Sequence, residues 1–159
     1  MARGNNEIKF VAKNVQKAIT DEWYAHFYYW IGSVIAGDEA KHVIEQFREH
    51  SSDEYDHANE LALWLRNFPR EATLPYAISE LPKNQYCGDI FPSGNTVSAL
   101  LLNAIKGEKC AIDFYDAFLV DIYTMDFYER NLIEEILERI LEKEREHLVD
   151  LERLFVEIF

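Results

Sequence analysis

Residues 52–61 read SDEYDHANEL, which places a glutamate and a histidine three residues apart, at Glu54 and His57. Three residues make nearly one helical turn, so both side chains leave a helix on the same side. The apolar stripe that precedes this segment continues, at three-and-four spacing, onto His50, Glu54 and His57. The core face of this predicted helix therefore carries side chains of the kind that bind metals.

The same spacing recurs near the C-terminus, at Glu144 and His147. Apolar residues repeat every three or four positions from Ile133 to Ile158, and these two polar side chains occupy core positions within that repeat. Charged side chains are rarely fully buried unless they are paired or bind a metal, because burying a lone charge is costly. Two interruptions of the same kind indicate a common cause.

Two further apolar stripes have a glutamate at their centre, Glu22 in the first and Glu108 in the third. Across four helices the pattern is therefore Glu, Glu-x-x-His, Glu, Glu-x-x-His, which is the ligand set of di-iron or di-manganese carboxylate bundles. The surroundings repeat as well, since each of these glutamates is followed seven residues later by a tyrosine, Tyr29 or Tyr115. This internal repeat is expected of two helical hairpins related by a pseudo-twofold axis.

The Glu-x-x-His motif is weak by itself, because a third match occurs at Glu39 and His42. That match precedes Glu54 by roughly four helical turns and has no carboxylate repeat facing it, so we interpret it as a solvated helix start. A metal-free acidic bundle is the alternative explanation for the buried charges.

These residues resemble the ferritin-like superfamily over nearly the whole chain, and within it the intrasubunit site of bacterioferritin. The positions of the two cysteines narrow the resemblance to one branch of the superfamily. Thioferritins, a Dps-like branch with a bacterioferritin-type site, carry one cysteine in the crossover before the third helix and another two residues after that helix's ligand glutamate. Here these are Cys87 and Cys110. The resemblance implies an all-α fold, a ferritin-like four-helix bundle made of two antiparallel helical hairpins with one long crossover between the second and third helices.

The length of 159 residues and the 48% hydrophobic content predict one domain, residues 1–159. Gly37 is expected to stop the first helix and Pro69 the second, and Asn95 or Thr96 to cap the third. We expect the helices at about residues 6–36, 39–67, 96–123 and 126–158, with the crossover at about 68–95.

The resemblance implies a role for each candidate ligand, both in binding metal and in catalysis. Two glutamates would bridge the metals, and each metal would have one further glutamate and one histidine. The bridging pair is Glu54 and Glu144, one metal is completed by Glu22 and His57, and the other by Glu108 and His147. The implied cofactors are two iron ions per subunit, with manganese as an alternative. No haem is expected, because the position of bacterioferritin's haem-ligand methionine is Tyr55 here.

Other residues have two explanations each. His26 is either an accessory ligand or a core or interface histidine with satisfied partners. Tyr29 and Tyr115 either hydrogen-bond the ligands or donate electrons, or they pack in the core with a polar end. Cysteines in a cytosolic chain are by default free and inert, whereas the resemblance implies that Cys87 and Cys110 form a disulfide with a possible redox role.

The resemblance implies a ferroxidase that oxidises Fe(II) with hydrogen peroxide or dioxygen and stores Fe(III) in a protein shell. A dodecamer is expected ahead of a 24-mer, because only twelve residues follow His147 and leave no room for a fifth helix. The alternatives are a stand-alone di-iron or di-manganese peroxidase or catalase, and a metal-free structural bundle. The net charge of −13 argues against a nucleic-acid partner. No apolar leader or membrane span is evident, so a cytoplasmic location is expected.

Overall fold

The computed structural model describes residues 2–37, 40–67, 87 and 96–159, and every regular element within them is helical. None of the helices in this described part is both long and apolar enough to cross a membrane. The expected crossover lies outside the described residues, apart from Cys87. The helices are α1 (Ala2–Ile35), α2 (Lys41–Asn67), α3 (Val97–Tyr123) and α4 (Arg130–Ile158).

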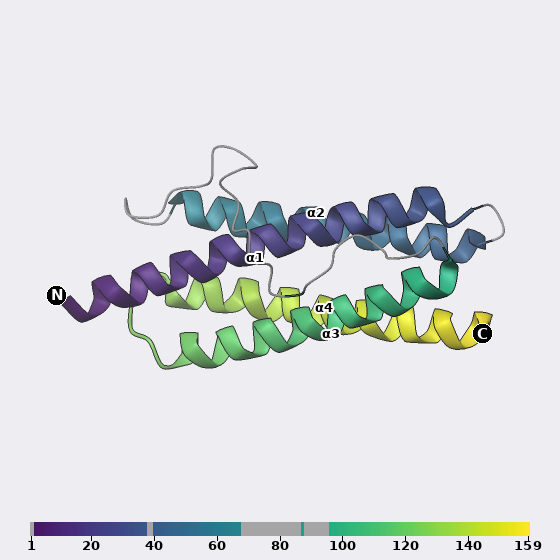
Figure 1. The fold of residues 1–159 in the computed structure, drawn as a ribbon. Helices are drawn as coiled ribbons and strands as arrows, with labels where there is room; N and C mark the ends of the chain where they lie inside the picture. The colour runs from purple at the N-terminus through teal and green to yellow at the C-terminus, as the bar shows by residue number, and fades with distance from the viewer. Residues whose placement is uncertain (1, 38–39, 68–86, 88–95) are drawn as a thin grey trace.

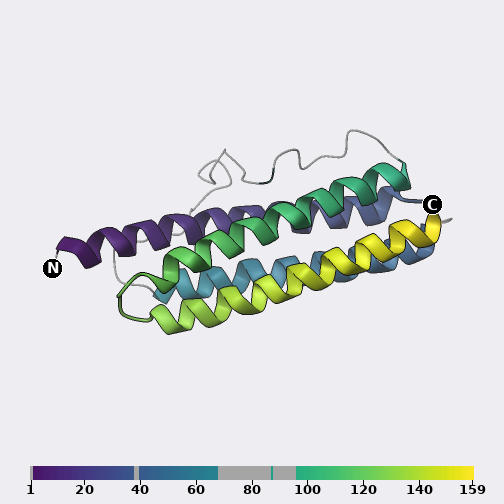
Figure 2. The same ribbon diagram turned by 90° about the horizontal axis from the view of Figure 1, so that it is seen from below.

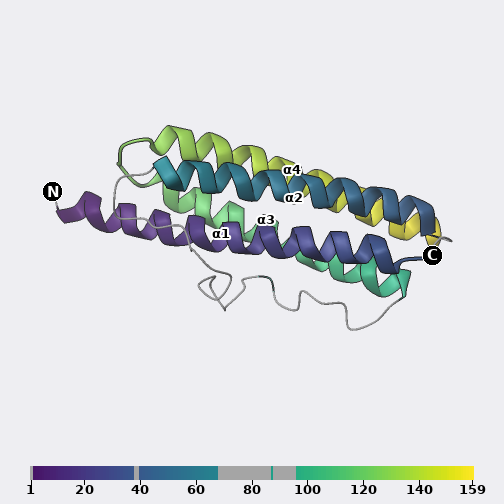
Figure 3. The same cartoon turned by 90° about the horizontal axis from the view of Figure 1, so that it is seen from above.

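The four helices form one bundle of two antiparallel hairpins. Helix α1 runs away from the N-terminus and α2 returns beside it, while α3 and α4 form the second pair (Figure 1). Helices α2 and α3 run in the same direction, and the views from below and above show the hairpins packed against each other (Figure 2, Figure 3). Contacts between α1 and α3 and between α2 and α4 hold the hairpins together. The expected all-α four-helix bundle is confirmed.

Local sequence explains two of the helix ends. Helix α1 ends at Ile35, and Gly37 follows with a φ of +76°, a left-handed conformation that glycine adopts without steric cost. Helix α3 begins after Thr96, whose side-chain oxygen accepts a hydrogen bond from the backbone N–H of Ala99 at 3.2 Å. Both features agree with the stop and cap signals in the sequence.

Two helix starts differ from expectation. Helix α1 already begins at Ala2, so the apolar stripe is preceded by additional helix, as helix formation propagates readily once nucleated. Helix α4 begins at Arg130 and not near residue 126, because Glu129 has a φ of 67°, which a right-handed helix cannot include. In the connection before it, Met125 and Phe127 pack against the hydrophobic core.

The hydrophobic core consists of two clusters at opposite ends of the bundle, and the predicted ligands lie between them along each helix. On α3, for example, Ala104 belongs to one cluster and Phe114 to the other, with Glu108 between them. On α4 the same order holds for Leu141, Glu144 and Leu151. The apolar clusters therefore close both ends of a polar layer and separate it from water.

Two helical glycines offer a test of the packing. A Cβ at Gly32 would lie 2.6 Å from two ring carbons of Phe47, whose side chain is fully buried, whereas a Cβ at Gly107 would meet nothing within 4 Å. Gly32→Ala is expected to lower the free energy of unfolding by about 1–3 kcal/mol. Gly107→Ala should raise it by about 0.5–1 kcal/mol, since alanine favours helix. Denaturant unfolding followed by circular dichroism measures both, and a stabilising Gly32→Ala would contradict this packing.

Candidate metal centre

The polar layer contains all six predicted ligands, and all six are buried. Helices α1 and α3 each contribute one glutamate, and α2 and α4 each contribute a glutamate and a histidine one turn apart. The fold brings these residues together because each occupies the middle of a core-facing stripe. The six residues are Glu22, Glu54, His57, Glu108, Glu144 and His147.

The ligand-type atoms of these residues form two groups, in each of which all the atoms lie within 4.8 Å of one another. One group is Glu22, Glu54, His57 and Glu144, and the other is Glu54, Glu108, Glu144 and His147. The groups share Glu54 and Glu144, so two metal positions could use these carboxylates in common. The resemblance implies the same division, and the role of each residue remains a prediction.

His57 lies at the heart of the first group. Its Nδ1 is 3.1 Å from Oε2 of Glu54, 3.1 Å from Oε1 of Glu144 and 3.4 Å from Oε2 of Glu22. Three carboxylates from three helices therefore converge on one ring nitrogen.

His147 occupies the corresponding place in the second group. Its Nδ1 lies 3.2 Å from Oε1 of Glu54 and 3.9 Å from Oε1 of Glu108. Its other ring nitrogen, Nε2, donates a hydrogen bond of 3.1 Å to Oδ2 of Asp53. A carboxylate in this position fixes the tautomer and leaves the Nδ1 lone pair for a metal. The sequence indicated that such an acceptor is needed but did not identify Asp53.

Two tyrosines hold the outer glutamates. The hydroxyl of Tyr29 on α1 donates to Oε1 of Glu108 on α3, and the hydroxyl of Tyr115 on α3 donates to Oε1 of Glu22 on α1. The two bonds cross between the hairpins in the same way, as the repeat predicts. Each tyrosine thus orients a carboxylate of the opposite hairpin, in addition to packing in the core.

The remaining histidines differ in position. His26 lies outside both groups, and its Nδ1 contacts the carbonyl oxygen and the hydroxyl of Ser51 at 2.8 and 3.0 Å. Of the two explanations for His26, a core or interface histidine with satisfied hydrogen-bond partners fits this arrangement. His42 is largely exposed, while Glu39 lies outside the described residues.

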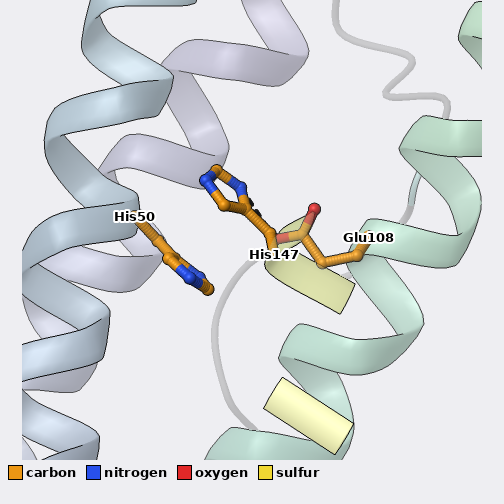
Figure 4. A group of neighbouring side chains, drawn as sticks. All are labelled: His50, Glu108 and His147. Carbon is orange, nitrogen blue, oxygen red and sulfur yellow. Dashed lines mark ion pairs between the residues drawn. The ribbon is translucent and has the colours of Figure 1, made fainter. Parts of the chain in front are cut away.

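His50 was not among the predicted site residues. It is buried, and it forms a third group of possible donors with Glu108 and His147, again within 4.8 Å (Figure 4). A signal for it was present in the sequence, because the three-and-four stripe passes through His50, Glu54 and His57.

Burial strongly affects the carboxylates of the centre. Together with the neighbouring charges of Glu54 and Glu22, it raises the pKa of Glu144 to about 7. Burial also raises the pKa of Glu108 well above its ordinary value of 4.5, and the charges of Glu144 and Glu54 add to the effect. Without a metal, this cluster therefore retains protons at neutral pH.

The histidines respond to the same surroundings in different directions. Burial alone would lower the pKa of His147, but hydrogen bonds to Asp53 and Glu54 outweigh it and raise that pKa to about 11. Burial likewise opposes the charged form of His57, yet the surrounding carboxylates outweigh burial and raise the pKa of His57 well above its ordinary value. Burial lowers the pKa of His50 to about 3, and the nearby His147 adds to that decrease.

The donor set fits one or two divalent metal ions. Among the described residues, Oε1 of Glu54, Oε1 of Glu144 and Nδ1 of His147 are buried and make no well-aligned hydrogen bond, although each has an ion-pair partner within 3.2 Å. Such atoms are costly in a folded protein unless something satisfies them. Carboxylate oxygens with imidazole nitrogens suit iron or manganese, and a divalent ion would also offset the buried negative charge.

Comparison with known proteins agrees with this architecture. The dodecameric thioferritin described as the bacterioferritin-related protein from Bacteroides fragilis matches with a TM-score of 0.84 and 25% identity, over 95% of this chain and 87% of that chain. The fold is ferritin-like. A ferritin-like, diiron-carboxylate protein from Bacillus anthracis str. Ames matches with a TM-score of 0.68 and 20% identity, over 94% of this chain and 97% of that chain. No family model and no curated protein matches the sequence.

This ferritin-like bundle also contains the disulfide that the resemblance implied. Cys87 is bonded to Cys110, with 5.4 Å between their Cα atoms. Cys110 lies on α3 two residues after Glu108, so the disulfide attaches Cys87 to the helix that carries a candidate ligand. The disulfide is confirmed, and its redox role remains a prediction.

The stability of the metal-free protein is expected to fall as pH rises. A group whose pKa is raised by folding stabilises the fold below its unfolded pKa and loses that contribution as pH passes its folded pKa. For Glu144 this window runs from 4.5 to about 7, and for His147 from 6.5 to about 11. A bound divalent ion replaces these protons, so the melting temperature of the metal-bound form should change less.

Thermal unfolding followed by circular dichroism, with and without Co²⁺, checks this expectation between about pH 5 and pH 9. The separation between the two melting temperatures should widen with pH. A metal-free melting temperature that increases over this range would contradict the protonated cluster.

Proposed function

We propose that this protein is a ferroxidase that oxidises Fe(II) at a dinuclear site within each bundle and retains the Fe(III) product in a shell of identical subunits. The observation that carries the proposal is the pair of four-residue donor groups that share Glu54 and Glu144. Carboxylates shared in this way would hold two metal ions near each other, and two Fe(II) ions would supply two electrons to one oxidant. Iron is proposed as the metal, with manganese as the alternative.

The reaction with peroxide balances without a further reductant. Two Fe(II) ions each give up one electron, the O–O bond of hydrogen peroxide breaks, and two protons are taken up to form two water molecules. The four carboxylates offset the charge of two divalent ions before oxidation. Metal binding would release protons from Glu144 and from the histidines, and the two protons of the oxidation step would come from the solvent.

Residues around the site would hold the donors in position. Tyr29 and Tyr115 fix the outer carboxylates, and Asp53 fixes the ring of His147. Donors that are already held in place bind a metal more tightly, because little side-chain conformational freedom is lost on binding. The apolar clusters on either side limit the access of water.

An anaerobic Fe(II) titration followed by oxidant tests the proposal. Two Fe(II) ions per chain should be oxidised rapidly on addition of peroxide, with growth of the near-ultraviolet ferric absorbance, and a large excess should continue to be oxidised and remain soluble. Oxidation that stops at two ions per chain would indicate a peroxidase without storage. A rate equal to that of protein-free buffer would overturn the ferroxidase proposal.

We further propose that twelve chains form the shell. The Bacteroides fragilis neighbour is dodecameric and shares the fold over nearly the whole chain. Large apolar side chains such as Phe27, Trp30 and Tyr55 are exposed on α1 and α2, where subunit contacts would cover them. Light scattering on the purified protein should give a mass near twelve times the 18.7 kDa of one chain. A monomer, or a mass near twenty-four chains, would contradict the dodecamer.

A further inference from the structure

His50 is a buried imidazole that the six proposed ligands leave unused. Its side chain is only 1% exposed, and among the described residues its Nδ1 has no hydrogen-bond partner. Its Nε2 lies 2.9 Å from Nε2 of Gln46. A buried polar atom without a partner destabilises a fold, so an apolar residue would serve better here if packing were the only requirement.

The surroundings of His50 contain two of the proposed ligands. Its ring stacks on the ring of His147, with 4.0 Å between the centroids. Ligand-type atoms of His50, Glu108 and His147 lie within 4.8 Å of one another. Two donors on opposite sides of an ion are separated by about twice a bond length of about 2.1 Å, or about 4.2 Å. The spacing therefore fits one ion, once the stacked rings of His50 and His147 turn so that their nitrogens converge on it.

His50 and Glu108 project from α2 and α3 towards His147, which lies between them (Figure 4). Nε2 of His147 is occupied by its hydrogen bond to Asp53, so only Nδ1 is available, and it can bind one ion at a time. An ion bound with His50 must therefore be the same ion that otherwise contacts Glu54 and Glu144. The His50 group is an alternative position and does not hold an additional ion.

We propose that the metal ion on the Glu108 side has a second position, formed by His50, Glu108 and His147, through which it enters and leaves the centre. An ion that leaves a four-residue donor set must break its bonds one after another. The second position keeps two of those donors and replaces the shared carboxylates by one imidazole. An ion that is leaving the dinuclear centre would therefore remain bound at this second position before it is released.

Comparison of the two halves of the internal repeat shows that only the Glu108 half of the centre has such an additional histidine. His50 precedes Glu54 by four residues, and the residue four positions before Glu144 is Ile140, which is buried and apolar. The ion on the Glu22 and His57 side thus has no corresponding imidazole from α4. The two metal positions should consequently exchange their ions at different rates. This inference rests on the proposed dinuclear site and adds the route of exchange.

Crystals of the parent protein saturated with Co²⁺ give the first test. Anomalous difference maps should show a peak within bonding distance of Nδ1 of His50, in addition to peaks between the shared glutamates. Absence of any peak beside His50 would overturn the second position. Two Co²⁺ ions at the glutamates alone would leave the dinuclear site intact, whereas no bound Co²⁺ at all would overturn both proposals.

Metal exchange in solution gives the second test. His50→Ile installs the residue found at the twin position, and Ile140→Val is the control for a small change at that twin position. Chelator-induced loss of the visible Co²⁺ spectrum should be biphasic in the parent and in the control. In His50→Ile the fast phase should slow by about tenfold, as removal of groups next to metal ligands typically has effects of that size or larger.

The number of Co²⁺ ions bound per chain should remain two in all three proteins. Unchanged chelation kinetics in a folded His50→Ile variant would overturn the proposed exchange route. If that variant fails to fold, as judged by circular dichroism, the Co²⁺ map of the parent decides the question.

Discussion

Replacing Glu54 by alanine is expected to reduce the rate of Fe(II) oxidation by more than about 100-fold, because this carboxylate belongs to both donor groups. In the proposed dinuclear site its loss would remove a donor shared by both metal positions, so the two ions would no longer be held as a pair. Glu144 has the same place in both groups, and Glu144→Ala should have an equally large effect. Stopped-flow absorbance after mixing Fe(II)-loaded protein with peroxide measures the rate.

The matched control is Glu142→Ala, which removes one carboxylate from the same helix as Glu144 but from an exposed position. This variant should oxidise iron at the parent rate. Helix content should persist in all three variants, since removal of a buried carboxylate also relieves charge repulsion in the metal-free cluster. Parent-like oxidation by both Glu54→Ala and Glu144→Ala would show that the site lies elsewhere.

Loss of the disulfide is expected to have the largest effect on stability. The bond between Cys87 and Cys110 spans a sequence separation of 23 residues. In the chain-entropy account, closing a loop of this size stabilises the fold by about 3 kcal/mol. For a chain of this length the corresponding decrease in melting temperature is about 6–12 °C. Calorimetry of Cys87→Ser against the oxidised parent measures it.

The double variant, with both cysteines replaced by serine, is the control, because it removes the same single bond. It should unfold at nearly the same temperature as Cys87→Ser, and dithiothreitol should lower the melting temperature of the parent to a similar value. If the free energy of unfolding changes by less than about 1 kcal/mol, the disulfide does not stabilise the fold by lowering the conformational entropy of the unfolded chain. Comparing peroxide-driven iron oxidation in parent and variants then separates a redox role from a purely stabilising one.

Periodicity accounts for what could be predicted about the site. A residue that falls on the buried stripe of a long helix must face the bundle axis, so Glu22, Glu54 and Glu108 could be placed at the centre before any coordinates were known. The internal repeat then matched α1 with α3 and α2 with α4. Helix ends were predictable where a local signal sets them, as at Gly37 and Thr96.

Residues whose role depends on a neighbouring helix were harder to predict. Asp53 precedes Glu54 and lies off the stripe, and nothing in α2 shows that the ring of His147 ends beside it. The late start of α4 depends on the left-handed conformation of Glu129, a residue type that seldom adopts it. His50 lay on the predicted stripe, but only the stacked ring of His147 distinguishes it from an ordinary core position.

The sequence by itself determined the helical class, the core faces and the six acidic and imidazole residues on them, because these follow from spacing within one helix. Only the tertiary structure decided which residues meet across helices. It paired each tyrosine with a glutamate of the other hairpin, and it gave coordinates to two pairings that spacing alone left open and only the resemblance implied, Glu54 with Glu144 and Cys87 with Cys110. The physical reason is that such contacts depend on the packing of whole helices, whose relative rotation and offset are set by the summed burial of many side chains.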